Sequence, residues 1–202
     1  MRRRHVLALA TFAWTATRLS AAGAGTIVKT RVETALGAFD IEVDTAVAPV
    51  TVANYLAYVD RGLLDRASVY RVVTLANQPP DTRHKIEVVQ WGLDLPDGQG
   101  PALPAIAHET TRQSGLRHLD GTVSMARSQP GTATSEFFIC IGDQPSLDFG
   151  GGRNPDGQGF AAFGQVVSGQ DVARALHAKG QATQRLSSPI AITSVRRVPP
   201  AR

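Results

Sequence analysis

Short β-branched segments, separated by connections that carry glycine and proline, constrain the fold of this chain more than any other feature. Strands alternate their side chains between two faces, and runs of Val, Ile, Thr and aromatic residues favour them. We expect strands at residues 27–33, 38–44, 69–74, 86–92, 122–126, 136–141, 160–167 and 189–198. The turn Ala35-Leu36-Gly37 indicates a hairpin between the first two.

Two segments carry the 3.6-residue apolar spacing of a helix. The first covers residues 49–61, begins with Pro49 and is followed by Gly62. The second covers residues 170–178, with Ser168 as a possible cap and Gly180 as its stop. We read residues 93–114 as a long irregular segment. Eight strands and two helices predict a mainly β protein, a closed eight-stranded antiparallel barrel with two capping helices, because closure removes open sheet edges.

Residues 1–24 have the pattern of a secretory signal peptide. Three arginines at positions 2–4 precede an apolar run at 6–16 and a small-residue stretch at 20–25. That run is about half of the roughly 20 residues needed to span a bilayer, which favours cleavage after Ala24 over a retained anchor. We therefore predict one domain over residues 25–202, exported to the periplasm or secreted, with no membrane span after cleavage.

The basic balance of the chain comes from this leader. The whole chain has 21 basic and 17 acidic residues, and the leader holds four arginines and no acidic residue, so 17 basic residues remain against 17 acidic ones. A nearly neutral surface argues against nucleic acid as a partner, because binding phosphate backbones needs a concentrated basic face.

Motifs for metal, cofactor and nucleophilic chemistry find no support. The five histidines lack metal-ligand spacing and are interpreted as surface or loop residues. The single cysteine, Cys140, lies in an apolar run and is expected to be a buried, inert thiol. The glycine-rich run at 150–159 lacks the Gly-Lys-Ser/Thr and the helix of a phosphate-binding loop. We expect no metal and no cofactor.

Several short strings occur in an order that is more specific than any one of them. They are Y-R-V at 70–72, Q-W-G at 90–92, S-M-A at 124–126, S-E-F-F-I at 135–139 and A-F-G-Q-V at 162–166. In these the chain resembles the cyclophilins, a family of peptidyl-prolyl cis-trans isomerases, over about residues 27–198. The resemblance implies an eight-stranded barrel with a groove on one outer face that binds X-Pro segments of unfolded or folding proteins.

The resemblance also implies which residues act. Arg71, Gln90 and Phe138 match the catalytic arginine, the groove glutamine and the floor of the proline pocket. Phe137 and Phe138 are adjacent in a strand and must face opposite sides of the sheet, so that one can be core and the other can face the groove. Further substrate-binding positions are Val88, Met125, Ala126, Arg127, Glu136, Leu147 and Phe160. Leu147 fits loop packing as well as pocket lining.

Four departures from the family pattern bear on activity. Tyr70 replaces the usual histidine, Trp91 the first glycine of Q-G-G, and Glu136 a glutamine. Ser146 replaces the tryptophan that is important for cyclosporin binding, so we predict weak cyclosporin affinity.

The sequence therefore predicts a monomeric isomerase that acts on proline-containing segments during the folding of exported proteins. Two alternatives stay open. One is a module that binds proline peptides without turnover, favoured by Trp91 and Glu136. The other is a secreted interaction protein that uses a different face.

Overall fold

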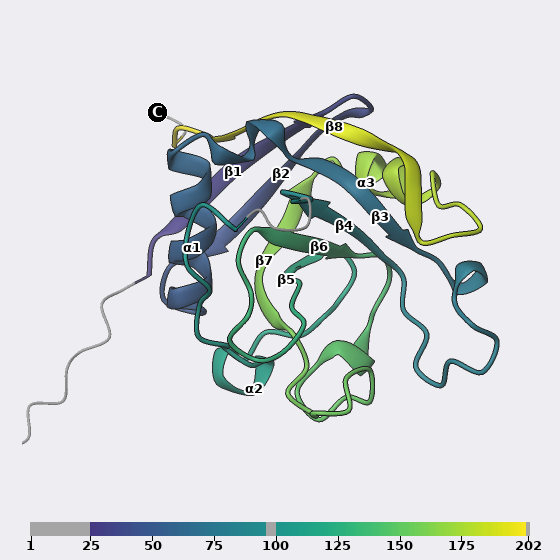
Figure 1. Ribbon diagram of the computed structural model, residues 1–202. Helices are drawn as coiled ribbons and strands as arrows, with labels where there is room; N and C mark the ends of the chain where they lie inside the picture. The colour runs from purple at the N-terminus through teal and green to yellow at the C-terminus, as the bar shows by residue number, and fades with distance from the viewer. Residues whose placement is uncertain (1–24, 96–99, 201–202) are drawn as a thin grey trace, which may run out of the picture.

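The computed structural model describes residues 25–95 and 100–200, so the predicted leader lies outside the described residues. Eight antiparallel strands close into one barrel in the order β1-β2-β7-β5-β6-β4-β3-β8, as predicted (Figure 1). The strands are β1 (Ile27–Thr34), β2 (Gly37–Asp44), β3 (Ser68–Val73), β4 (Val88–Gly92), β5 (Thr122–Met125), β6 (Glu136–Cys140), β7 (Ala161–Ser168) and β8 (Arg185–Arg197).

Two longer helices lie at opposite ends of the barrel, α1 on the left of Figure 1 and α3 on the right. The helical segments are α1 (Pro49–Asp60), η1 (Leu63–Arg66), η2 (Leu75–Asn77), α2 (Thr111–Ser114), η3 (Pro145–Leu147) and α3 (Gln170–His177). Pro49 occupies the first turn of α1, where its missing N–H costs nothing. Within residues 25–95 and 100–200, every helix is too short or too polar to cross a membrane.

Two predicted boundaries, the start of β8 and the cap of α3, differ from the structure. Strand β8 begins four residues before Pro189, which lies between the paired positions Arg185 and Ile190, where the ladder with β3 shifts register. A proline cannot donate to the ladder, and the irregularity accommodates it. The cap of α3 is Gly169 rather than Ser168. Gly169 has φ +75°, and a Cβ at this position would lie 2.4 Å from the Ala38 carbonyl oxygen, so the position favours glycine.

Strands β4 and β6 are buried on both faces, and this positions the site. Val89, Trp91, Phe137 and Ile139 point into the barrel and join its main core. Val88, Phe138 and Cys140 of the same strands point outward. They form a second apolar cluster with Val73 of β3, Ile86 of the connection before β4 and Leu147 of η3. The predicted division between Phe137 and Phe138 is confirmed.

Cys140 belongs to the second cluster and is fully buried. Its burial raises the pKa of the thiol well above the usual range, which leaves it protonated and unreactive at neutral pH.

Trp91 fills the centre of the barrel. Its ring centroid lies 4.9 Å from that of Phe137 and 6.4 Å from that of Phe39, and its exposed fraction is 0%. Its indole Nε1 has no hydrogen-bond partner within the described part of the chain. The ring therefore faces away from the groove, so Trp91 gives no support to the alternative of a module that binds without turnover.

Candidate active site

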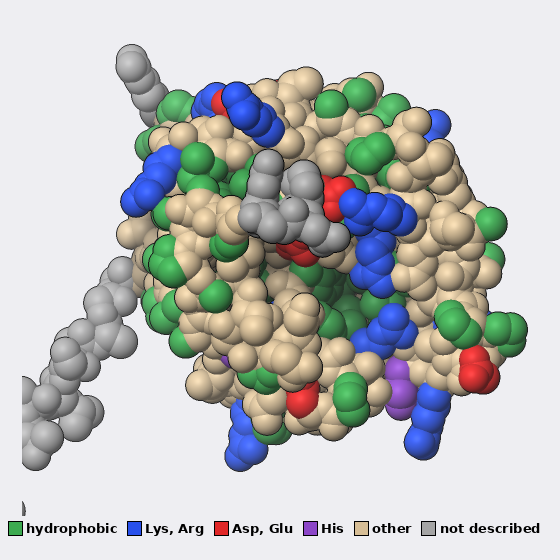
Figure 2. Space-filling model, in the orientation of Figure 1, with side chains coloured by type: hydrophobic (Ala, Val, Ile, Leu, Met, Phe, Trp, Pro, Cys, Tyr) green, Lys and Arg blue, Asp and Glu red, His purple; other side chains and the backbone are tan. Residues whose placement is uncertain are grey.

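A pocket of about 380 Å³ opens on the outer face of the β3-β4-β6 wall. Figure 2 shows it as a hollow with an apolar floor and arginine side chains along one rim. Its lining residues are Arg71, Ile86, Val88, Gln90, Ala126, Arg127, Ser128, Thr132, Thr134, Glu136, Phe138, Leu147, Arg153, Asn154 and Phe160. The structure thus brings nine of the ten predicted site residues together.

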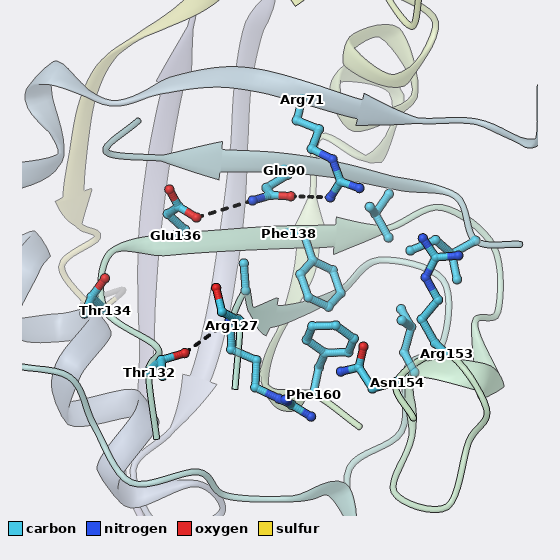
Figure 3. Close-up of a pocket in the computed structure, with 15 residues that line it drawn as sticks. Arg71, Gln90, Arg127, Thr132, Thr134, Glu136, Phe138, Arg153, Asn154 and Phe160 are labelled. Carbon is cyan, nitrogen blue, oxygen red and sulfur yellow. Dashed lines mark hydrogen bonds between the residues drawn. The ribbon is translucent and has the colours of Figure 1, made fainter. Parts of the chain in front are cut away.

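Arg71 projects from β3 over this pocket and is held by two glutamine amides (Figure 3). Its Nη1 donates to Gln90 Oε1 at 2.7 Å, and its Nε and Nη2 donate to Gln184 Oε1 at 3.1 and 2.5 Å. Both partners are neutral, so the guanidinium is oriented while its charge stays uncompensated. Burial is the main cause that lowers the pKa of Arg71, yet a guanidinium remains protonated at neutral pH.

Gln90 links Arg71 to the other end of the groove. Arginine has only donors, so the amide oxygen of Gln90 must face it and the NH₂ group must point the other way. That NH₂ group lies 2.5 Å from the Tyr70 hydroxyl and 3.4 Å from Glu136 Oε2. Both neighbours can accept, and this fixes the Gln90 side chain in one orientation.

Tyr70 reaches Gln90 because β3 is irregular at this point. The pairing of β3 with β4 runs from Val69–Trp91 directly to Arg71–Gln90 and skips Tyr70. An extra residue of this kind lets two neighbours lie on the same side of a sheet. Tyr70, which stands where the resemblance implied a histidine, therefore supports the groove. Its burial raises the pKa of its hydroxyl well above the usual range.

Phe138 forms the apolar floor. It is 4% exposed, and its ring meets that of Phe160 edge-on with centroids 5.3 Å apart. Val88 and Leu147 complete this floor, and Leu147 is both fully buried and part of the pocket lining, so both readings of that residue hold. The result is an apolar recess below a charged guanidinium.

Ala126 and Arg127 both line the pocket, and Figure 3 shows Arg127 at its lower rim. The Ala126 N–H donates to the Glu136 carbonyl oxygen at 2.9 Å. The guanidinium of Arg127 binds Asp156 at 2.8 and 3.0 Å and the Gly159 carbonyl oxygen at 2.9 Å, and it lies over the Phe160 ring. The Arg127 side chain therefore fastens the 148–160 loop and holds Phe160 at the recess.

Met125 is the predicted site residue that the structure does not bring to the pocket. Its side chain is 1% exposed and belongs to the main barrel core. Side chains alternate along β5, so Val123 and Met125 point inward while Ser124 points outward. The assignment of the Met125 side chain to the substrate groove is corrected.

His118 lies in a loop, as expected for the histidines, but it is buried behind the pocket and not on the surface. It is 1% exposed and stacks on Phe138 with centroids 5.9 Å apart. Its ring nitrogens bind Asp148 Oδ1 at 2.7 Å and Ser124 Oγ at 2.9 Å. His118 thus packs against Phe138 and, through its bond to Asp148, connects the pocket floor to the segment that carries Leu147.

This burial predicts a pH dependence of stability. Desolvation lowers the pKa of His118 in the folded protein below its usual value of about 6.5. The unfolded chain then binds more protons just below that pH, so the free energy of unfolding should fall as the pH drops from about 6.5 towards the folded pKa. The limiting slope is about 1.4 kcal/mol per pH unit. Urea titrations at several pH values should show a shallower slope of the free energy of unfolding against pH in His118→Gln than in wild type. Equal slopes in wild type and His118→Gln would contradict the assignment.

Sequence reasoning missed Gln184, His118 and Arg153 as parts of the site. Gln184 follows no motif and reaches Arg71 only because β8 pairs with β3. Arg153 lies in the glycine-rich loop and is carried to the pocket by its bonds to Gln78 Oε1 and the His84 carbonyl oxygen. No local pattern marks these residues, because each contact joins distant parts of the chain.

A closed antiparallel barrel with an arginine–glutamine pair above an external apolar recess defines a cyclophilin-type architecture. The family profile described as "Cyclophilin type peptidyl-prolyl cis-trans isomerase/CLD" matches residues 28–197. The chain belongs to this family and is a peptidyl-prolyl cis-trans isomerase.

Curated relatives agree with this assignment. The chain is 37% identical over 145 residues to peptidyl-prolyl cis-trans isomerase cyp18 of Streptomyces antibioticus, covering 71% of this chain and 79% of that protein. It is 34% identical over 141 residues to peptidyl-prolyl cis-trans isomerase A of Dickeya dadantii, covering 69% and 66%. A crystal structure of a cyclophilin type peptidyl-prolyl cis-trans isomerase of Cryptosporidium parvum superposes with a TM-score of 0.69 at 18% identity, covering 87% of this chain and all of that one. That likeness concerns the fold alone.

Proposed function

We propose that this isomerase accelerates rotation about X-Pro bonds in exported proteins as they fold, with Arg71 as the catalytic group. The observation that carries the proposal is the guanidinium of Arg71, oriented by Gln90 and Gln184 without a carboxylate and aimed over an apolar recess. We expect the enzyme to be a monomer that acts on proline-containing segments of unfolded chains.

The chemistry requires such a group and little else. A prolyl amide crosses a barrier of about 18–20 kcal/mol, because twisting the C–N bond breaks its resonance. No covalent bond to the protein is needed. The twisted nitrogen becomes pyramidal and regains its lone pair, and Arg71 donates a hydrogen bond to it. This bond is stronger in the twisted state than in the planar one, and only such a difference accelerates the reaction.

The remaining residues hold the substrate in place. Phe138, Leu147 and Phe160 enclose the pyrrolidine ring while the acyl side turns. Gln90 and Gln184 position Arg71 through the bonds described above. An acceleration of 10⁴ to 10⁶ corresponds to about 5.5–8 kcal/mol, which is within reach of a charged hydrogen bond combined with a shaped apolar recess.

A refolding experiment tests the role in folding. A small protein whose slow refolding phase is limited by one native cis-proline should lose that phase as residues 25–202 are added at substoichiometric amounts. A slow phase that stays unchanged, with fast phases also unchanged, would contradict the role.

The exported location needs its own test. When the full chain is expressed in a bacterium, the protein should be recovered outside the cytoplasm. Its mass should equal that of a chain whose first residue is Gly25. Recovery of the full-length mass in the cytosolic fraction would contradict export and cleavage.

A further inference from the structure

Charged groups of opposite sign line the two ends of the groove. In Figure 3 Glu136 lies at one end, Arg153 at the other, and Arg71 between them, with Phe138 below. All four side chains line the same pocket. A proline ring on Phe138 would therefore leave the flanking residues of its peptide facing opposite charges.

Arg153 carries an uncompensated charge at its end. Its Nη1 donates to Gln78 Oε1 at 3.2 Å and to the His84 carbonyl oxygen at 2.9 Å, and both acceptors are neutral. Across residues 25–95 and 100–200, no carboxylate lies within ion-pair distance of it. Burial lowers the pKa of Arg153, and Arg153 in turn contributes to the lowered pKa of Arg71. Two guanidinium groups thus repel each other at this end, and a carboxylate would relieve both.

Arg127 does not share this property, although it lines the same pocket. Its guanidinium is paired with Asp156 in a two-pronged contact at 2.8 and 3.0 Å. Its charge is therefore neutralised inside the protein, and Arg127 adds little to the positive electrostatic potential in the groove. The positive end is set by Arg153 and Arg71.

Glu136 carries the opposite charge at the other end. Its polar neighbours are the Gln90 amide at 3.4 Å and the Tyr70 hydroxyl, both neutral, and within the described residues no cation lies at ion-pair distance from it. Arg185, a cation whose charge lowers the pKa of Glu136, is bound to Asp94. Burial is the main cause that raises the pKa of Glu136, as expected for a carboxylate whose charge lacks a partner. A cationic side chain of a ligand would supply that partner.

We infer that the groove is charge-polarised and selects X-Pro segments that carry an acidic residue on one side of the proline and a basic residue on the other, in one order only. This inference rests on the proposed function and adds a substrate class to it. In the favoured order the acidic group meets Arg153 and Arg71, and the basic group meets Glu136. In the reverse order both ends repel the peptide. Electrostatic complementarity of this kind sets orientation and partner choice more than raw affinity.

Two peptides of equal composition provide the test. They are acetyl-Lys-Ala-Pro-Glu-amide and acetyl-Glu-Ala-Pro-Lys-amide, with acetyl-Gln-Ala-Pro-Gln-amide as the uncharged reference. Blocked ends leave only the side-chain charges. We expect one charged order to be isomerised with a kcat/KM at least about fivefold above the other, with the reference between them, as partly exposed ion pairs allow. The difference should shrink at high salt.

Variants then assign the effect to these residues. Arg153→Gln and Glu136→Gln should each bring the ratio of the two orders closer to one. The double exchange Arg153→Glu with Glu136→Arg should invert the preference, which a structural disturbance would not do. Arg174→Gln removes a charge on α3 that is bound to Asp120 outside the groove and should leave the ratio unchanged.

Equal kcat/KM for the two orders in wild type, with the uncharged peptide still turned over, would overturn the inference and leave the isomerase function intact. A ratio that persists in the double exchange would also overturn it. If none of the three peptides were isomerised, that result would instead count against the proposed function.

Discussion

Replacing Arg71 with alanine is expected to lower kcat/KM for a proline peptide by about 100- to 1000-fold, the usual loss when one preorganised donor to a transition state is removed. The guanidinium is the charged donor above the recess, and its two glutamine partners cannot replace it. Arg71→Lys should recover only part of the loss, because an ammonium lacks the planar fork that both glutamines hold. A protease-coupled isomerase assay on residues 25–202 measures both values.

Arg31→Ala provides the matched control for this substitution. Arg31 is bound to Asp40 between β1 and β2 through bonds of 2.7 and 3.0 Å, and it is absent from the pocket lining. Its loss should leave kcat/KM within about twofold of wild type. If a folded Arg71→Ala protein kept kcat/KM within the same range, the role assigned to Arg71 would be wrong.

Replacing Trp91 with alanine should destabilise the fold and spare the chemistry. The ring fills the barrel beside Phe39 and Phe137, and deleting a large aromatic ring from a core costs about 3–5 kcal/mol. That is a large share of the roughly 5–15 kcal/mol that stabilises a domain. Denaturant unfolding measures the loss, and kcat/KM at low temperature, where the variant remains folded, should stay close to wild type.

Trp91→Phe separates ring packing from the indole N–H. The phenyl ring keeps most of the packing and removes a buried N–H without a partner, whose burial costs about 1–3 kcal/mol. We expect a much smaller destabilisation than in Trp91→Ala. Trp91 is the only tryptophan of residues 25–202, so its fluorescence reports on this site alone. Strong quenching of that fluorescence by a bound proline peptide would contradict the placement of the ring inside the barrel.

The barrel itself could be predicted because its signals are local. Period-two patterns gave all eight strands within a few residues, and Pro49 and Gly62 bounded the first helix. The opposite orientation of Phe137 and Phe138 followed from strand geometry alone. The same geometry would have placed Met125 with Val123 inside the barrel, but the resemblance of its string was given more weight.

The rest of the site depends on register and on long-range contacts. Tyr70 shares a face with Arg71 only because the β3-β4 pairing skips Tyr70, and no residue type in this segment predicts such an irregularity. Trp91 was counted in favour of a non-catalytic binding module because its neighbour Gln90 faces the groove, although adjacent strand residues face opposite ways. Gln184 and His118 act through partners 113 and 30 positions away in the sequence. Contacts of this kind appear only when the barrel is closed.

The most direct test of the central claim is two-dimensional NMR exchange on a blocked Ala-Pro peptide with residues 25–202 at about one hundredth of the peptide concentration. The uncatalysed cis and trans forms interconvert over tens of seconds or longer and give no exchange peaks on the sub-second mixing time. The account predicts cis–trans exchange peaks with wild type and their loss with Arg71→Ala. Peptide signals that shift on titration with excess wild-type protein, without exchange peaks at any protein concentration, would identify a groove that binds proline peptides but does not isomerise them.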